Sequence, residues 1–252
     1  MVSNLDLMGD NMCFSKAKLL LLQIRNQGDP MRDQEISCFA AAAGIETSQI
    51  SPWDLLAGRP GGGFVDRHDA VLIGGSGDYS VTRESGWLDA SLDLMRDLVR
   101  ESKPTFASCW GFQAMAKAHA GKVETDLSRA EVGTHQLHLT EAGKKDSLFR
   151  TLGEQFRGQM GHEDCVVRLP EEAVLLASSD IVEHQAYRMG DRPIWCTQFH
   201  PELKREQLLV RVLKYPAYIE NIAGIPADRF GELLEDAPET EGLMQQFMRV
   251  AL

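Results

Sequence analysis

The strongest constraint on the fold of this chain is a repeated order of short apolar runs and helical segments in its first half. Such runs are typical of strands that are buried on both faces of a parallel sheet. They lie at residues 17–24, 70–73 and 104–107. Helices are expected over residues 33–43, 87–100 and 111–120, and Gly44 and Gly121 stand where helices commonly end. This alternation predicts βαβ units and a mostly parallel sheet.

The second half has a different pattern. Short strand-like pieces between turns are expected at residues 132–140, 166–169, 173–178, 184–189 and 194–199. From Arg205 onward the chain has helical character, with interruptions at Pro216, Pro226 and Pro238. Its last piece carries Leu243, Met244, Phe247 and Met248 at the spacing of a buried helix face. We therefore expect a doubly wound, mostly parallel α/β sheet flanked by helices, with a smaller antiparallel section.

The domain organisation follows from length and composition. A chain of 252 residues, 43% of them hydrophobic, can bury the core of one large domain. We expect this domain over residues 17–204, preceded by an N-terminal extension of residues 1–16. Residues 205–252 are expected to form a helical C-terminal extension that packs on the same domain.

Charge excludes some classes of partner. The formal net charge is −11 and no basic patch is visible, which argues against a nucleic-acid binder. Part of the acid excess forms one cluster, either a solvated segment or a docking site for a basic partner: Glu232, Glu235, Asp236, Glu239 and Glu241. The apolar run at residues 19–22 is too short to span a membrane, and the N-terminus does not resemble a signal peptide.

Cysteine usage indicates a reducing cytoplasm. The five cysteines are Cys13, Cys38, Cys109, Cys165 and Cys196. Their odd number and irregular spacing argue against a disulfide framework, and no CxxC pair suggests structural zinc. His162 and Asp164 form too small a cluster for a metal site, so neither a metal nor a cofactor is expected.

Cys109 is the first candidate for catalysis. It lies between an expected buried strand and an expected helix, where a nucleophile elbow lifts a reactive side chain above the sheet edge. Ala107 and Gly111 are small enough for strand and helix to pack closely. The helix N-terminus after Cys109 lowers a thiol pKa, and the N–H of Trp110 is free to bind an oxyanion. The alternative is an inert buried cysteine.

His200 and Glu202 follow the last expected strand. Residues two apart in an extended chain point the same way, and Pro201 favours extended geometry at His200. A carboxylate beside an imidazole fixes its tautomer and raises its basicity, as a general base for a thiol requires. The alternative is a surface His-Pro-Glu at a strand end.

A glycine-rich loop completes the candidate site. Gly74, Gly75 and Gly77 follow the strand at residues 70–73, and their backbone can approach a ligand closely. The N–H of Gly75 is the expected second oxyanion donor. A plain tight loop is the alternative. Since the loop, the elbow and the His-x-Glu segment each follow a strand, they should meet at the ligand-binding edge of the sheet.

The order of these three motifs resembles the class I glutamine amidotransferase family. The resemblance spans residues 18–202, with residues 108–113 similar to the nucleophile motif and residues 195–202 similar to the closing motif. It is strongest to stand-alone domains similar to the glutaminase part of GMP synthetase, whose His-x-Asp segment resembles residues 161–164. The chain departs from the family where Ala107 replaces a glycine and Cys196 replaces a small residue. Cys196 is interpreted as a core residue, with redox sensing as the alternative.

The resemblance implies a flavodoxin-like fold and hydrolysis of the side-chain amide of glutamine. It implies a Cys109–His200–Glu202 triad with a thioester intermediate, oxyanion contacts from Gly75 and Trp110, and substrate contacts from Gly74 and Gln113. Ammonia would pass to a separate synthetase subunit, or the domain would act alone. A γ-glutamyl peptidase with the same triad is the alternative within enzymes. A catalytically idle binding relative is the alternative from another class. The oligomeric state is left open.

Overall fold

The computed structural model describes residues 14–216 and 218–252 and contains a nine-stranded mixed sheet. Five neighbouring strands are parallel. In spatial order they are β2 (Ile50–Asp54), β1 (Leu19–Gln23), β3 (Ala70–Ile73), β4 (Thr105–Ser108) and β11 (Ile194–Thr197). Antiparallel strands continue the sheet as β10 (Ala186–Met189), β9 (Ala173–Ser178), β6 (Glu131–Leu139) and β7 (Gln155–His162). A separate antiparallel pair is formed by β5 (Lys122–Thr125) and β8 (Asp164–Arg168).

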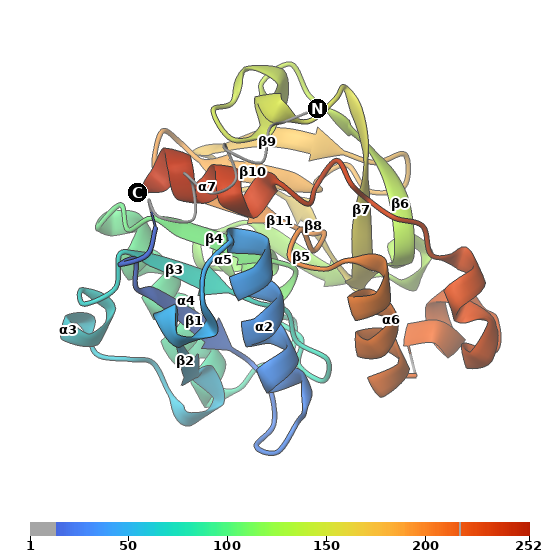
Figure 1. Ribbon diagram of the computed structural model, residues 1–252, viewed down its shortest axis with the longest axis horizontal. Helices are drawn as coiled ribbons and strands as arrows, with labels where there is room; N and C mark the ends of the chain where they lie inside the picture. Colours follow the sequence, from blue (N-terminus) through green and yellow to red (C-terminus); the bar gives the residue numbers. More distant parts are fainter. Residues whose placement is uncertain (1–13, 217) are drawn as a thin grey trace.

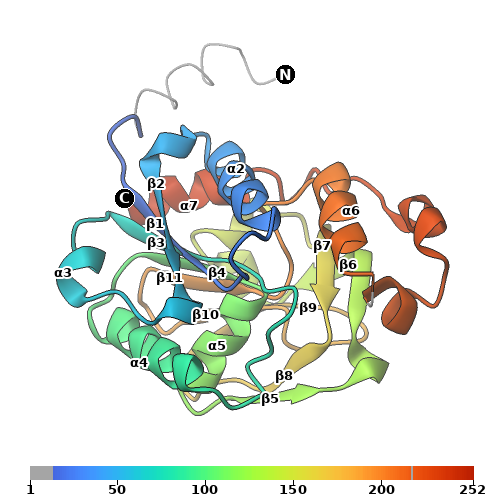
Figure 2. The same cartoon turned by 90° about the horizontal axis from the view of Figure 1, so that it is seen from below.

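Helices cover both faces of the parallel half (Figures 1 and 2). On one face lie α2 (Met31–Ala43) and α7 (Leu243–Ala251), and on the other lie α4 (Gly86–Arg100) and α5 (Trp110–Ala118). Successive side chains of a strand point to opposite faces, so Leu19 and Leu21 join the core beneath α2 and α7. Leu20 and Leu22 join the core beneath α4 and α5. This arrangement confirms the expected doubly wound α/β sheet with an antiparallel section.

The remaining helical segments lie between these four helices in the sequence, and all of them except α6 are short. They comprise α3 (Gly62–Val65), α6 (Arg205–Lys214), a π-helical turn (Ile219–Ala223) and 3₁₀ segments at Thr47–Gln49, Leu55–Ala57, Leu127–Arg129, Gly143–Lys145, Phe149–Thr151 and Ala227–Leu233. After residue 204 the described part of the chain thus contains four helical pieces: α6, the π-helical turn, the last 3₁₀ segment and α7. Within α7 all four expected core residues are buried, and the Phe247 ring lies 5.5 Å from that of Phe106.

Three strands of the structure are absent from the sequence-based expectation. Strand β2 lies at the sheet edge and contains Pro52, and its half-exposed residues do not form an apolar run. Strand β5 is short and largely exposed. Strand β7 contains Gly158 and Gly161 and lacks a clear alternation, yet it pairs with β6 over eight residues. These three segments form strands because they pair with neighbouring strands in the folded chain.

The helix expected to end at Ala120 stops at Ala118. Ala120 has a left-handed backbone with φ 62°, and the N–H of Gly121 donates to the carbonyl of Ala116 at 2.8 Å. The other expected boundaries either match the structure, as for β3 and β9, or differ from it by one or two residues. Of the expected N-terminal extension, residues 1–13, including Cys13, lie outside the described residues. None of the helices in the described ranges has the length and apolar character of a membrane span.

Candidate active site

Cys109 occupies a strained turn between β4 and α5. Its backbone angles, φ 51° and ψ −102°, are rarely adopted by a residue with a side chain, and its N–H donates to the Thr197 carbonyl at 2.8 Å. A Cβ on Gly111 would lie 2.7 Å from Ile73 Cγ2 and 3.1 Å from Ala107 Cβ. Only glycine fits here, while alanine fits at residue 107. The turn therefore has the geometry of a nucleophile elbow.

His200 and Glu202 form a buried pair just beyond β11. His200 Nδ1 lies 2.7 Å from Glu202 Oε1, and the two residues are 4% and 2% exposed. The backbone N–H of His200 donates to the backbone carbonyl of Gln159 at 2.9 Å, and this hydrogen bond joins the segment to β7. Since Glu202 holds Nδ1, the other ring nitrogen, Nε2, is left for a proton exchange with a neighbouring group.

The elbow, the His-Glu pair and the glycine loop meet at one edge of the sheet. Strands β4 and β11 are parallel neighbours, with Ser108 opposite Thr197, so Cys109 and His200 follow adjacent strand ends. Gly75 lies against both side chains. A Cβ built on it would lie 2.9 Å from His200 Cε1 and 3.6 Å from Cys109 Cβ. The structure thus brings the three sequence motifs together at the carboxyl ends of β3, β4 and β11.

The electrostatics of the pair favour its charged form. Burial by itself lowers the pKa of His200, but the negative charges of Glu202 and of a Cys109 thiolate outweigh burial and raise the pKa to about 9. Burial raises the pKa of Glu202, but the positive charges of His200 and Arg211 outweigh it and lower the pKa below its usual value. At neutral pH the site therefore holds an imidazolium beside a carboxylate.

The backbone N–H groups expected to bind an oxyanion differ in their availability. The N–H of Gly74 donates to the Leu22 carbonyl at 3.3 Å, so it is already used within the fold. The N–H of Gly75 donates to no acceptor among the described residues. Trp110 is the first residue of α5, where a backbone N–H has no partner inside the helix. The backbone N–H groups of Gly75 and Trp110 are thus available to a ligand, whereas that of Gly74 is not.

Gln113 is more constrained than the sequence suggested. It is 4% exposed, and its Nε2 donates to the Asp164 carbonyl at 3.0 Å and to Gln198 Oε1 at 3.1 Å. Both hydrogens of the side-chain amide are therefore used inside the protein. Gln113 still lines the cavity described next, but only its side-chain oxygen remains for a ligand.

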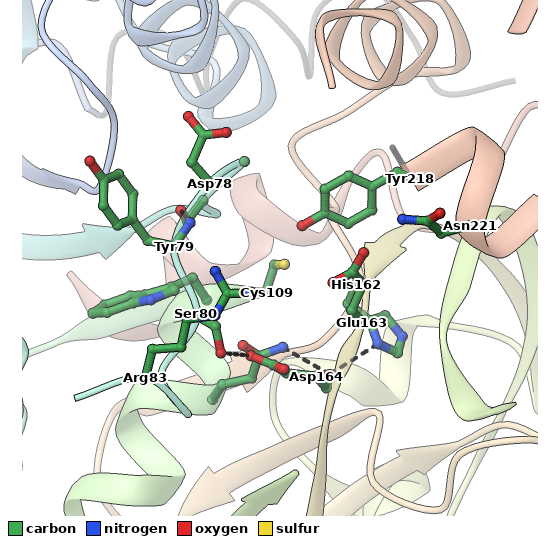
Figure 3. Close-up of a pocket in the computed structure, with 14 residues that line it drawn as sticks. Asp78, Tyr79, Ser80, Arg83, Cys109, His162, Glu163, Asp164, Tyr218 and Asn221 are labelled. Atoms are coloured by element: carbon green, nitrogen blue, oxygen red, sulfur yellow. Dashed lines mark hydrogen bonds between the residues drawn. The ribbon is translucent and has the colours of Figure 1, made fainter. Parts of the chain in front are cut away.

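A cavity of about 330 Å³ opens in front of Cys109 (Figure 3). Arg83 is the only arginine or lysine among the described residues that line it, and the lining carboxylates are Asp78, Glu163 and Asp164. Asp164 accepts hydrogen bonds from Ser80 and Thr125, and Asp78 accepts one from Asn26 at 2.9 Å. Arg83 and Glu163 form no side-chain hydrogen bond or ion pair with another described residue. The cavity thus presents one cation and one carboxylate that are free for a ligand.

His162 and the other three cysteines of the described residues are held inside the protein. His162 is buried, with Nε2 3.0 Å from Glu131 Oε2 and Nδ1 3.1 Å from the Asp164 carbonyl oxygen. Cys38, Cys165 and Cys196 are buried free thiols, and burial raises the pKa of Cys196 to about 12. Cys196 is thus a core residue, as interpreted from the sequence.

Comparison with known proteins decides the family. The family model described as "Glutamine amidotransferase class-I" matches residues 63–214, which span more than half of the chain and include all of the elbow and the His-Glu pair. The chain belongs to the class I glutamine amidotransferases. As expected from the resemblance, it is a member of a family of enzymes.

Two relatives of this amidotransferase differ in how much of their own length the match covers. A glutamine-hydrolysing GMP synthase of Christiangramia forsetii is 37% identical over 134 residues, which cover 53% of this chain but only 25% of the synthase. Gamma-glutamyl peptidase 3 of Arabidopsis thaliana is 27% identical over 184 residues, covering 68% of this chain and 69% of the peptidase. The chain thus spans about a quarter of the length of the synthase.

The fold of the amidotransferase is shared with solved structures. A glutamine amidotransferase of Thermotoga maritima superposes with a TM-score of 0.74 at 18% identity, covering 93% of this chain and 97% of that one. Identity at this level shows the fold alone. The match covers the parallel and the antiparallel sections together, so the mixed sheet is that of class I glutamine amidotransferases.

Some residues of the candidate site have no signal in the sequence. Arg83 and Tyr218 line the cavity from segments that lie 26 residues before and 109 residues after Cys109. Arg211, on α6, contacts Glu202. No residue spacing indicates such contacts, because each of them depends on the path of a whole segment. Only an alignment of homologues could have suggested them from sequence.

Proposed function

We propose that this chain hydrolyses the side-chain amide of glutamine, with Cys109 as nucleophile, His200 as proton carrier and Glu202 as the group that orients His200. One observation carries the proposal: a cysteine in a strained elbow, next to a buried His-Glu pair, faces a cavity large enough for a small ligand.

The reaction follows from the positions of these groups. The Cys109 thiolate attacks the γ-carbonyl carbon, and the N–H groups of Gly75 and Trp110 bind the oxyanion, each contributing on the order of 3 kcal/mol to lowering the barrier. The His200 imidazolium gives its proton to the amide nitrogen, so ammonia leaves and a thioester remains. His200 then takes a proton from water, whose oxygen attacks the thioester. Glutamate leaves and the thiolate with its imidazolium is restored.

The fate of ammonia is part of the proposal. The match to GMP synthase covers only a quarter of that protein, so an acceptor for ammonia would lie outside the matched region. We propose that ammonia is either passed to a separate synthetase subunit or released. An assay of this chain alone reports the hydrolysis in both cases.

A second candidate is cleavage of γ-glutamyl peptides by the same residues. The match to a gamma-glutamyl peptidase covers about two thirds of both chains, more of the relative than the synthase match does. The chemistry differs only in the leaving group, because an amine of an amino acid replaces ammonia. The cavity in front of Cys109 would have to accept that larger group.

A substrate panel separates these functions. Purified protein is assayed for glutamate released from glutamine, glutathione and a γ-glutamyl dipeptide. We expect the highest kcat/KM with glutamine. A preference for the peptides would support the second candidate. Release of glutamate from none of them, together with no labelling of Cys109 by a glutamine-like electrophile, would indicate a catalytically idle binding relative.

Arg83 is expected to bind the α-carboxylate of the substrate. Its unpaired guanidinium faces the same cavity as Cys109, and a charge-assisted hydrogen bond to a carboxylate contributes about 1.5–3 kcal/mol. We expect Arg83→Gln to raise the KM for glutamine about 10- to 100-fold with little change in kcat. L-glutaminamide lacks the α-carboxylate, so its KM should not respond to the substitution.

The control for this prediction is Arg150→Gln, which replaces an exposed arginine that does not line the cavity. It should leave both KM values unchanged. An equal response of glutamine and glutaminamide to Arg83→Gln would contradict a contact between Arg83 and the α-carboxylate.

A further inference from the structure

Helix α6 contributes a buried arginine to the surroundings of Glu202. Arg211 is 6% exposed, and its Nη1 lies 3.4 Å from Glu202 Oε1. The same oxygen receives the hydrogen bond from His200 Nδ1 at 2.7 Å. Among the described residues, Glu202 Oε2 has no hydrogen-bond partner. The Glu202 carboxylate is thus held through one oxygen, by His200 on one side and Arg211 on the other.

The guanidinium of Arg211 is itself fixed by helix α2. Its Nε donates to Gln34 Oε1 at 3.0 Å, and Gln34 Nε2 donates to the backbone carbonyl of Gln207 at 3.0 Å. Gln34 therefore bridges α2 to two residues of α6. Since Arg211 forms no ion pair with any other described carboxylate, its buried charge is balanced by Glu202.

The groups that face Glu202 set the charge of the site. Lys204 and Glu241 line a cavity beside Glu202 and pair with each other at 3.2 Å. The groups that act on the Glu202 carboxylate are His200 from its own segment, Arg211 from α6 and the Cys38 thiol from α2. His200 and Arg211 both lower the pKa of Glu202, whereas burial raises it. Arg211 is the only permanent cation among these three groups. Its charge favours the ionised form of Glu202 in either protonation state of His200.

The end of α6 also supports the glycine loop. A Cβ on Gly77 would overlap the ring of Tyr215, which closes α6. The Tyr215 hydroxyl accepts a hydrogen bond from Arg25 at 2.8 Å and donates one to Asp29. Arg25 in turn pairs with Glu35 at 3.1 Å, a buried carboxylate of α2. One segment of the C-terminal part thus packs against both Glu202 and the loop that carries Gly75.

From these contacts we infer that Arg211 is a positioning residue of the active site, which orients Glu202 and, through it, the His200 ring. The inference rests on the proposed role of the Cys109–His200–Glu202 triad. It makes α6 part of the catalytic apparatus, although α6 follows the His200–Glu202 segment and carries none of the three sequence motifs.

The test compares Arg211→Met with Arg211→Lys. We expect Arg211→Met to lower kcat for glutamine about 10- to 100-fold with little change in KM, because a misplaced base slows the reaction and leaves the substrate contacts intact. Without the cation the pKa of Glu202 rises, so the acid limb of the kcat profile should move to higher pH. Arg211→Lys keeps the positive charge but loses the planar guanidinium. Its kcat should lie between those of Arg211→Met and the wild type, and the acid limb of its pH profile should lie close to that of the wild type.

A matched control lies on the same helix. Arg205 is exposed and donates to the Gly231 carbonyl at 3.1 Å, so Arg205→Met should leave kcat and the pH profile unchanged. Circular dichroism and thermal unfolding check that each variant is folded. If Arg211→Met does not fold, Arg211→Lys is compared with the wild type instead. A lower kcat with a nearly unchanged acid limb of the pH profile is then the expected result.

A second measurement does not depend on turnover. Titration of the Glu202 carboxyl by ¹³C NMR should give a higher pKa in Arg211→Met than in the wild type, with Arg211→Lys close to the wild type. If the wild type hydrolyses no substrate but the Glu202 shift is observed, the proposed function fails and the Arg211–Glu202 coupling stands. Wild-type kcat, pH profile and Glu202 titration in a folded Arg211→Met would overturn the inference.

Discussion

Replacing Cys109 by alanine is expected to abolish glutamine hydrolysis, with a loss on the order of 10⁶-fold in kcat, because no other group can form the thioester. Cys109→Ser should be nearly as inactive, since a serine hydroxyl is a much weaker nucleophile than a cysteine sulfur. Initial rates of ammonia and glutamate release measure the effect, and binding of glutamine by calorimetry checks that the cavity is intact.

The matched control is Cys196→Ala. Cys196 is fully buried in β11 and lines none of the cavities described here, so its loss should reduce stability somewhat and leave kcat unchanged. A glutamine-like electrophile should add its mass to the wild type and to Cys196→Ala, but not to Cys109→Ala. Full glutaminase activity in Cys109→Ala would end the proposed mechanism.

Replacing Glu202 by glutamine is expected to lower kcat by about 10³- to 10⁴-fold, as loss of the orienting carboxylate does in comparable triads. Glu202 Oε1 accepts from His200 Nδ1 at 2.7 Å, and an amide in its place can present the wrong group to the ring. The alkaline limb of the pH profile should also change. His200 is protonated below its pKa of about 9, so wild-type kcat should fall as pH rises through about 9.

The direction of the change follows from the causes of that pKa. The Glu202 charge is the largest of the effects that raise the pKa of His200 against burial. Glu202→Gln removes this charge, so the imidazolium loses its proton at lower pH and the alkaline limb should move toward neutrality. Glu232→Gln, at an exposed carboxylate in the acidic C-terminal cluster, is the control and should leave the profile unchanged. An unmoved alkaline limb in Glu202→Gln would show that this limb does not report His200.

The architecture explains why these substitutions act on one site. Parallel strands place their carboxyl ends on the same edge of a sheet, and the segments that follow β3, β4 and β11 all emerge there. The elbow at Cys109 is tight because Gly111 packs against Ile73, a residue of β3. The strand that carries the glycine loop therefore also holds the elbow in place. A change in the packing of β3 would affect both.

Several features could be predicted from the sequence because they depend on local rules. Buried parallel strands require continuous apolar runs, and β3 was predicted with its observed bounds. Gly44 ends α2 in the left-handed conformation, φ 70°, that glycine adopts without strain. A small residue was expected at the elbow, and the close approach of Ile73 shows why. The motif order also indicated the family to which the chain belongs.

Other features were decided by tertiary structure alone. Strand β7 carries little strand signal, and its pairing with β6 makes it a strand. The side-chain nitrogen of Gln113 donates to the Asp164 carbonyl and to Gln198 Oε1, which β8 and the segment after β11 bring beside it. The expected contact of Gln113 with a substrate remains a prediction, for which its side-chain oxygen is available.

Local patterns in the amino-acid sequence indicate the buried parallel strands β1, β3, β4 and β11, the places where glycine is needed and the residue types that can perform cysteine-based hydrolysis. These properties follow from periodicity, backbone sterics and side-chain chemistry, all of which act over a few neighbouring residues. The packing of the whole chain brings Arg211 beside Glu202 and places Arg83 on the cavity in front of Cys109. Such contacts join segments whose separation in space depends on the packing of the whole chain, so no local pattern encodes them.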